Sequence, residues 1–359
     1  MPDRLRHEGI RRTNFCPIGG QSHVRTADAV MTVGPVRSLS MKRSTLAVAA
    51  CLPLLSGLIL QAPAQAATST TVSATLSSST VKIGSTTTVS GTVSGPSDRD
   101  VRLEVRLASG WRMLKASTTT STGSYSMTAP SQWIGGHDLR VVAPAAGTAT
   151  TGSSTARAFT VKPSWTPAGS SSDWRWLATD GDHPRYNPCR AISWKFNRNG
   201  GYAASLDDVK GAFHRLAQAT GLTFTYAGTT SVVPSSDRYD RSTAITVGFV
   251  SSLSGNIAGR GGGTWSVHDG YEEMVHGSLA LDRSEHLRTG FTSSGDATWG
   301  QIMEHELGHV LGLGHAAGSN QLMNGTASSR NHLMGAGDLS GFRAVGLHAG
   351  CIPNAVRTV

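Results

Sequence analysis

The first half of the chain alternates hydrophobic and polar residues with a period of two. The alternation is clearest at 101–107, where Val and Leu alternate with Arg and Glu, so that one face of a strand would be apolar and the other charged. Further strand-like runs, separated by turns rich in glycine, proline and serine, lie at 83–93, 124–129, 139–142 and 156–161. These strands predict a small antiparallel β-sandwich over residues 67–162.

A stretch rich in proline, glycine and serine, 163–172, has the composition of a linker. After it the apolar period changes from two to that of a helix. Ser205 is expected to be the N-cap of this helix, with Asp208 completing a capping box and Gly221 ending the helix. Strands are expected at 191–197, 222–226, 244–250 and 277–282, and a flexible glycine-rich loop at 259–263.

A second helix is predicted from about residue 298 to residue 311, with Asp296 or Thr298 as its N-cap. Strand–helix–strand–strand followed by a helix favours a mixed sheet with helices packed against it. The predicted fold class is therefore an all-β sandwich followed by an α/β (α+β) domain over 173–359. The sandwich resembles the immunoglobulin-like modules that are attached to many secreted bacterial proteins.

The N-terminus has the pattern of a secretory signal. Residues 41–66 combine a basic start, an apolar run and a small-x-small cleavage site at Ala64-Gln65-Ala66. Residues 1–40 fit neither a domain nor a signal, and we interpret them as an upstream extension of a chain that begins at Met41. A weaker alternative is a lipoprotein signal at Cys51. We expect a secreted, extracellular protein, with association to the cell wall left open.

Removal of the leader changes the charge and the cysteine count. The net charge of +9 falls to +4 without residues 1–66, so nothing in the remainder demands a nucleic acid or an anionic membrane. Of the four cysteines, Cys189 and Cys351 remain. In an exported protein such an isolated pair predicts a disulfide, the alternative being two free thiols.

The strongest chemical signal is the stretch HELGHVLGLGH at 305–315. On a helix, His305 and His309 project from one face and can reach the same metal ion. Glu306 lies beside them, where a general base for a zinc-activated water is needed. Gly312 can end the helix in a left-handed conformation, and the reversal brings His315 round as third ligand. An ordinary amphipathic helix with satisfied histidines is the alternative.

With its third histidine, the pattern resembles the metzincin zinc endopeptidases and, within them, the matrixin type. Met323 lies at a distance after His315 similar to that of the family's Met-turn, and 337–346 resembles the start of the family's last helix. The resemblance covers 173–359 and implies one catalytic Zn²⁺, with Glu306 as general base. The resemblance leaves a bound Ca²⁺ open. It argues against a second zinc, because Ala280 stands where a histidine ligand of a structural zinc would be expected.

The resemblance also implies that a peptide substrate pairs as an added strand with a sheet edge above the cleft. By position we expect this edge at Ser278, Leu279, Ala280 and Leu281. Two positions depart from the family pattern near the Met-turn. Asn324 follows the methionine where an aromatic residue is usual, and Gly337 replaces the first of two aspartates, leaving Asp338 as the candidate partner of the Met-turn.

The favoured function is that of a secreted zinc-dependent endopeptidase acting on proteins or peptides. We expect a monomer with no nucleic-acid partner and no stable membrane anchor. Two alternatives remain: a non-catalytic surface or adhesion protein with a structural zinc, and a metallohydrolase acting on cell-wall peptides. Substrate preference, latency and the role of the β-sandwich do not follow from the sequence.

Overall fold

The structure is a computed structural model that describes residues 66–178, 183–292 and 295–353. The expected upstream extension, 1–40, and all but the last residue of the expected signal segment, 41–66, lie outside the described residues. In the part of the chain that the structure describes, no helix combines the length and the apolar character needed to cross a membrane.

Residues 67–162 form two β-sheets. One has the strand order β1–β3–β6 and the other β2–β9–β7–β4–β5, with the short β8 paired to β7. The strands are β1 (Thr75–Leu76), β2 (Thr80–Lys82), β3 (Thr88–Thr92), β4 (Asp100–Leu107), β5 (Gly110–Thr118), β6 (Ser124–Thr128), β7 (Gly135–Ala143), β8 (Gly152–Ser153) and β9 (Arg157–Lys162). Each predicted run contains a strand, and the structure adds β1, β2, β5 and β8, which the alternation did not single out.

The period-two pattern of this region has the expected consequence for burial. In β4 the exposed fraction is 0% for Val101, Leu103 and Val105, while Arg102 and Arg106 are exposed. Apolar residues from both sheets share one core cluster. The assignment of this region to the immunoglobulin-like class stays a prediction.

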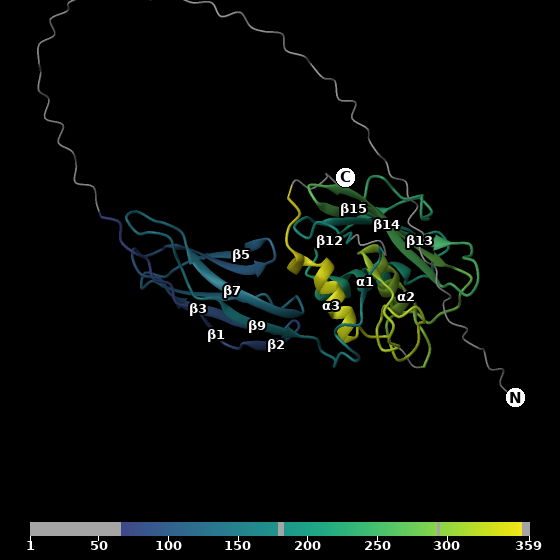
Figure 1. The fold of residues 1–359 in the computed structure, drawn as a ribbon, viewed down its shortest axis with the longest axis horizontal. Coiled ribbons are helices and arrows are strands. Elements are labelled where there is room, and N and C mark those ends of the chain that lie inside the picture. The colour runs from purple at the N-terminus through teal and green to yellow at the C-terminus, as the bar shows by residue number, and fades with distance from the viewer. Residues whose placement is uncertain (1–65, 179–182, 293–294, 354–359) are drawn as a thin grey trace, which may run out of the picture. The chain divides into compact units, whose positions relative to one another are not determined.

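The second region is built on a five-stranded sheet in the order β12–β11–β13–β15–β14. Its elements are β10 (Arg175–Trp176), β11 (Ile192–Asn197), α1 (Ser205–Thr220), β12 (Phe224–Thr229), β13 (Ile245–Val250), β14 (Gly259–His268), β15 (Tyr271–Asp282), α2 (Trp299–Val310), β16 (Leu313–Gly314), α3 (Ala336–Val345) and the 3₁₀ turn η1 (Leu347–Ala349). β14 is antiparallel to β15, and the other neighbours are parallel. Figure 1 shows α1 and α2 beneath these strands.

Helix α1 forms where the apolar period predicts it, but its start differs from the prediction. The N-cap is Ala204, and Ser205 is the first helical residue. The Asp208 side chain does not cap the helix; its Oδ2 accepts from the Gly290 N–H at 2.8 Å. The helix ends at Gly221 with a φ of 71°, a conformation that costs glycine little because it has no Cβ.

The glycine-rich run at 259–263 is a strand and not the flexible loop that its composition indicates. It forms the first half of β14 and pairs with β15, with Gly261 opposite Leu279. The expected linker contains no helix or strand, but it contacts the second region. The Trp165 Nε1–H donates to the Met334 carbonyl at 2.8 Å, and the Ala336 N–H donates to the Ala168 carbonyl at 2.8 Å.

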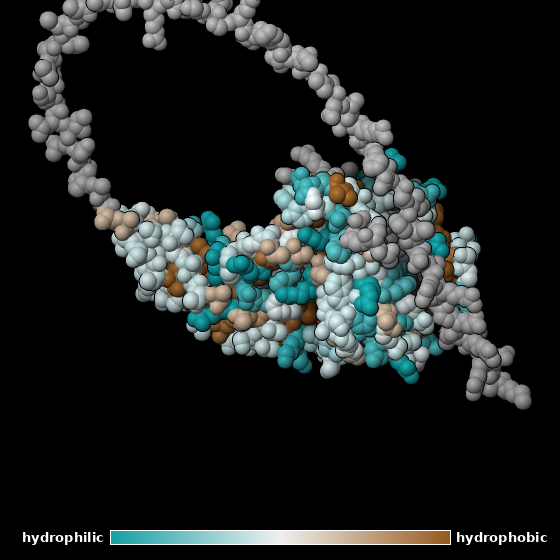
Figure 2. Space-filling model, viewed as in Figure 1, coloured by the Kyte–Doolittle hydropathy of each residue, from teal (hydrophilic) through white to brown (hydrophobic). Residues whose placement is uncertain are grey.

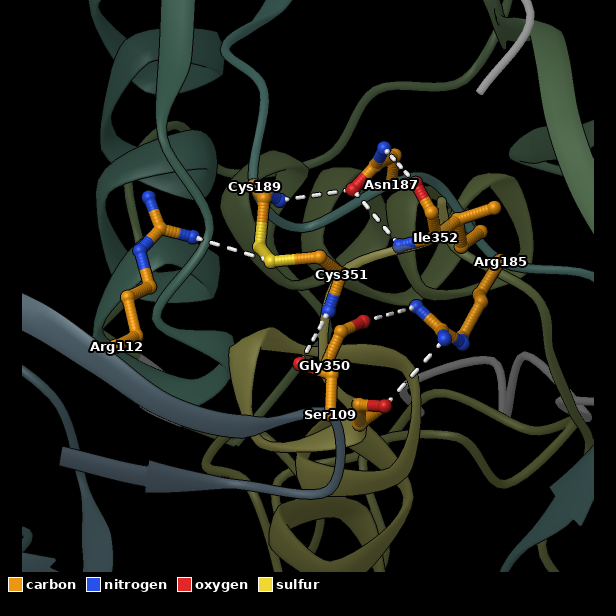
Figure 3. The surroundings of a disulfide bond; sticks show 9 residues. Ser109, Arg112, Arg185, Asn187, Cys189, Gly350, Cys351 and Ile352 are labelled. Atoms are coloured by element: carbon orange, nitrogen blue, oxygen red, sulfur yellow. Dashed lines mark hydrogen bonds between the residues drawn. A yellow bond between two sulfur atoms is a disulfide. The ribbon is translucent and has the colours of Figure 1, made fainter. Parts of the chain in front are cut away.

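The predicted disulfide between Cys189 and Cys351 is confirmed, with Cα atoms 5.2 Å apart. Figure 3 shows the Asn187 side chain beside it: its Nδ2–H donates to the Ile352 carbonyl at 2.9 Å, and its Oδ1 accepts from the Cys189 N–H at 3.1 Å. The Arg185 guanidinium donates to the Gly350 carbonyl at 3.1 Å. The last described residues are therefore fastened to the segment before β11 by hydrogen bonds as well as by the covalent bond.

The visible surface is mainly hydrophilic or intermediate in hydropathy, with hydrophobic side chains in small separated groups (Figure 2). Among the described residues, the exposed large hydrophobic side chains are Met113, Val233 and Val267. Scattered apolar residues of this kind are normal on protein surfaces.

Candidate metal centre and active site

Helix α2 carries the first two histidines of the motif. Its N-cap is Thr298, one of the two predicted candidates. The Thr298 Oγ1 accepts from the Gln301 N–H at 3.2 Å. Every residue of the helix is buried, because α1 and the sheet pack on it. His305 and His309 lie four residues apart, so their imidazoles share one face.

The third histidine reaches the site through a reversal at Gly312. Gly312 has a φ of 108°, and a Cβ there would lie 2.1 Å from the Pro184 carbonyl oxygen, so both conformation and space require glycine. The structure thereby brings the three predicted histidines together. The His309 Nε2 lies 3.1 Å from the Nε2 atoms of both His305 and His315.

Backbone carbonyls orient two of these rings. The His305 Nδ1 lies 2.7 Å from the Leu322 carbonyl oxygen, and the His309 Nδ1 lies 2.7 Å from the Leu313 carbonyl oxygen. An Nδ1–H that donates to a carbonyl leaves Nε2 with its lone pair, the form that binds a metal.

The electrostatics of the cluster keep the rings neutral. Burial lowers the pKa of His305, lowers that of His309 well below 6.5, and lowers that of His315 to about 4. Tetrahedral zinc with Zn–N bonds near 2.05 Å separates its ligand nitrogens by about 3.3 Å, close to the 3.1 Å between these Nε2 atoms. Three neutral imidazoles that converge in this way fit zinc.

Glu306 faces the edge strand of the sheet. Its side chain is buried, and its Oε2 accepts from the Gly261 N–H at 2.6 Å. Burial raises the pKa of Glu306 to about 7, although the Gly261 hydrogen bond and the Arg260 charge lower it. Gly261 allows this approach because a Cβ there would lie 1.9 Å from the Glu306 carbonyl oxygen. The glycines at 259–263 thus allow β14 to approach α2 closely, a role that their composition alone did not indicate.

Met323 lies under the motif helix. A Cβ on Gly308 would lie 2.3 Å from the Met323 Sδ, so α2 and the methionine are in direct contact. The Asp338 carboxylate fixes the turn: it accepts from the backbone N–H groups of Leu322 at 2.5 Å, Met323 at 3.0 Å and Gly335 at 2.7 Å. Burial raises the pKa of Asp338 to about 6 in spite of these bonds.

The loop that follows Met323 is organised by Asn331, a residue that no sequence motif marks. Its side chain is 0% exposed. The Asn331 Oδ1 accepts from the Gln301 Nε2 at 3.0 Å and the Ser328 N–H at 2.8 Å, and its Nδ2 donates to the carbonyls of Gln321 and Thr326, both at 3.0 Å. One amide side chain therefore joins this loop to α2.

The expected substrate-binding edge is wrong. Ser278, Leu279, Ala280 and Leu281 pair with β13 on one side and β14 on the other. All four are buried. The sheet edge is β14, because the chain adds the antiparallel strand 259–268 outside β15. The expectation of an edge at 278–281 depends on a loop at 259–263, whereas these residues belong to β14, which covers that side of β15.

Two departures from the family pattern are accommodated by direct contacts. The Asn324 Nδ2 donates to the carbonyls of Ala316 at 3.3 Å and Ala317 at 3.1 Å, so it fastens the loop after His315. A Cβ on Gly337 would lie 2.1 Å from the Asp173 carbonyl oxygen. An aspartate at 337 would therefore collide with the segment that precedes the sheet.

Comparisons with known proteins agree with this arrangement. Residues 190–344 match the family model described as Matrixin. No curated protein matches. A solved structure titled "Structural insight into host cell surface retention of a 1.5-MDa bacterial ice-binding adhesin" is similar at 16% identity over 33% of this chain and 38% of that chain, with a TM-score of 0.21. At that score the likeness carries no argument.

The Matrixin match spans the strand β11, both helices α1 and α2, the three histidines and the Met323 turn. It supports a zinc metalloprotease type of function, and it does not favour the non-catalytic alternative. The match thus supports a matrixin-type metzincin over residues 190–344.

Proposed function

We propose that the protein is a secreted zinc-dependent endopeptidase. The observation that carries the proposal is the convergence of three neutral imidazoles from His305, His309 and His315 beside the buried Glu306. Zinc bound by these residues would supply Lewis acidity, which lowers the pKa of a water molecule and polarises the carbonyl to be cleaved. The match to the matrixin family supports the same class.

Glu306 is the proposed general base. A carboxyl with a pKa near 7 can accept a proton and release it again at neutral pH, and burial gives Glu306 that pKa. The Gly261 N–H holds the Oε2 in place, so the carboxylate does not have to reorient during turnover. We assign Glu306 both steps: removal of a proton from the attacking water and its delivery to the leaving amine.

The substrate is proposed to bind as an extended peptide against the free edge of β14. This edge directly adjoins Glu306 through Gly261, and strand addition at a sheet edge fixes a peptide by its backbone. The proposal replaces the expected edge at 278–281. Met323 would be a packing floor for the metal site.

The remaining assignments complete the proposal. We propose a signal peptide at 41–66, a β-sandwich module at 67–162, a connector at 163–172 and a protease domain at 173–359, acting as a monomer outside the cell. The disulfide supports an oxidising compartment.

The decisive experiment measures casein hydrolysis by the purified chain. We expect activity that a chelator abolishes and added zinc restores, and that Glu306→Ala eliminates while the variant still binds zinc. A zinc-loaded, folded wild-type protein with no activity on casein or on a peptide library would refute the endopeptidase assignment. Turnover of purified cell wall without turnover of casein would favour the cell-wall alternative.

A further inference from the structure

The loop that carries His315 is contacted by a segment far upstream of it. β10 pairs antiparallel with β16, with Arg175 opposite Gly314 and Trp176 opposite Leu313. The Leu177 N–H also donates to the Gly312 carbonyl at 2.8 Å. The residues just before the third histidine are therefore held as one strand of a two-stranded ribbon.

The residues just after the third histidine are held by Asp173. Its Oδ1 accepts from the Ala317 N–H at 2.9 Å, and its Oδ2 accepts from the Gly318 N–H at 2.8 Å. One carboxylate thus binds two consecutive backbone donors, an arrangement that fixes both the position and the orientation of the turn. Hydrogen bonds to an ionised acceptor of this kind are stronger than those between neutral groups.

The opposite side of this loop lies against the Met-turn. The Ala316 N–H donates to the Met323 carbonyl at 2.9 Å, and a Cβ on Gly325 would lie 3.4 Å from the His315 ring. His315 is bracketed by the ribbon before it, by Asp173 after it and by the Met-turn beside it. Unlike His305 and His309, it is carried by a turn and not by a helix, so its order depends on these contacts.

The molecule makes room for the upstream segment. A Cβ on Gly318 would lie 2.4 Å from the Asp173 Oδ2, and one on Gly337 would lie 2.1 Å from the Asp173 carbonyl oxygen. Glycines thus occupy both points of close approach to Asp173: Gly318 in the loop after His315, and Gly337 in the first turn of α3. Asp173 lies outside the range 190–344 that matches the family model.

We propose that Asp173 is a positioning residue for the third metal ligand, His315. The inference rests on the proposed zinc site. Without the carboxylate, the Ala317 and Gly318 N–H groups turn to solvent and the turn gains freedom, which must be lost again when zinc binds. Removal of groups that orient metal ligands typically weakens metal binding by about 10–100-fold, and we expect the lower end because the loop is partly exposed.

The test measures zinc affinity by competition with a chromophoric chelator in the full chain, near neutral pH. Asp173→Ala should bind zinc about tenfold more weakly than the wild type. Asp173→Asn should fall between them, because its amide oxygen replaces one of the two carboxylate oxygens and its NH₂ group faces the other backbone N–H. Asp207→Ala, which removes an exposed carboxylate from α1, should match the wild type. Thermal unfolding of each metal-free variant checks that it is folded at the assay temperature.

Zinc affinity of Asp173→Ala within about twofold of the wild type overturns the role of Asp173 and leaves the zinc site standing. A wild-type protein that binds no zinc overturns both. If Asp173→Ala does not fold, Asp173→Asn decides: wild-type affinity overturns the proposal, and a loss greater than that of Asp207→Ala supports it.

Discussion

Asp338 offers a quantitative test of how the Met-turn supports the metal site. Its carboxylate is fully buried and accepts three backbone N–H groups, those of Leu322, Met323 and Gly335. In Asp338→Asn, the amide oxygen can take the place of Oδ2 and keep the Leu322 and Gly335 bonds. The amide NH₂ then faces the Met323 N–H, and one buried donor loses its acceptor.

A buried donor without a partner costs about 1–3 kcal/mol. We therefore expect Asp338→Asn to lower the free energy of unfolding by about 2 kcal/mol. Asp338→Ala strands all three donors, and three times that cost is about 6 kcal/mol, which approaches the whole stability of a typical domain. Zinc affinity should fall as well, because the Leu322 carbonyl that orients His305 belongs to the turn that Asp338 fixes.

The assay is urea unfolding of the metal-free protein, followed by chelator competition on the folded variants. Asp207→Asn, on the exposed face of α1, is the matched control for the loss of charge. An unfolding midpoint of Asp338→Asn equal to that of the control would refute the reasoning. So would a lowered midpoint with unchanged zinc affinity, since the turn would then stabilise the fold without positioning the ligand.

Three further predictions concern other parts of the chain. Gly261→Ala places a Cβ 1.9 Å from the Glu306 carbonyl oxygen. It should lower the free energy of unfolding by about 3 kcal/mol and remove most of the casein hydrolysis. Gly136→Ala, the control, has open space at its Cβ and should change neither quantity. Burial lowers the pKa of His137 from 6.5 to about 4, so the unfolded chain alone binds this proton within that window. The wild type should therefore lose up to roughly 3 kcal/mol as pH falls through it, and His137→Asn should show a flatter decline in pH-dependent unfolding. Cys351→Ser should lower the free energy of unfolding by up to about 5 kcal/mol relative to the disulfide-bonded wild type. The reduced wild type is the control, and its stability should equal that of the variant.

The sequence predicted the elements whose signals are local. Helix α1 follows from its apolar period and from Gly221, and the start of α2 follows from Thr298. The approach of His315 follows from Gly312, because a left-handed residue at that point reverses the chain. In each case the deciding interaction lies within a few residues, so a short window of sequence contains it.

The predictions that were wrong depended on partners distant in the sequence. β14 contains a run of glycines, so it has no side-chain alternation to mark it as a strand. Its place follows from Glu306 and β15, which approach closely only because side chains are missing. With β14 interpreted as a loop, 278–281 became the expected sheet edge. Ser205 is the first helical residue and not the N-cap, and the Asp208 carboxylate, expected to complete a capping box, accepts instead from the distant Gly290.

The tertiary contacts of Asp173 and Asn331 carry no local signature either. Asp173 binds a turn more than a hundred positions downstream. The composition of the residues just before Asp173 indicates only a linker. Asn331 lies in a loop whose residues are ordinary turn formers, and only its complete burial and its bonds to Gln301 and Gln321 distinguish it.

The late position of Asp338 and Cys351 has a consequence for biosynthesis. A chain that emerges from its N-terminus exposes Asp173 and Cys189 long before their partners exist. The loop that carries His315, the Met323 turn and the disulfide can form only after the residues from 315 to 351 have been synthesised. Such dependence on distant contacts makes folding slow. It also means that a chain that has not yet reached residue 338 lacks the carboxylate that fixes the Met-turn, so the Leu322 carbonyl is not yet in place to orient His305.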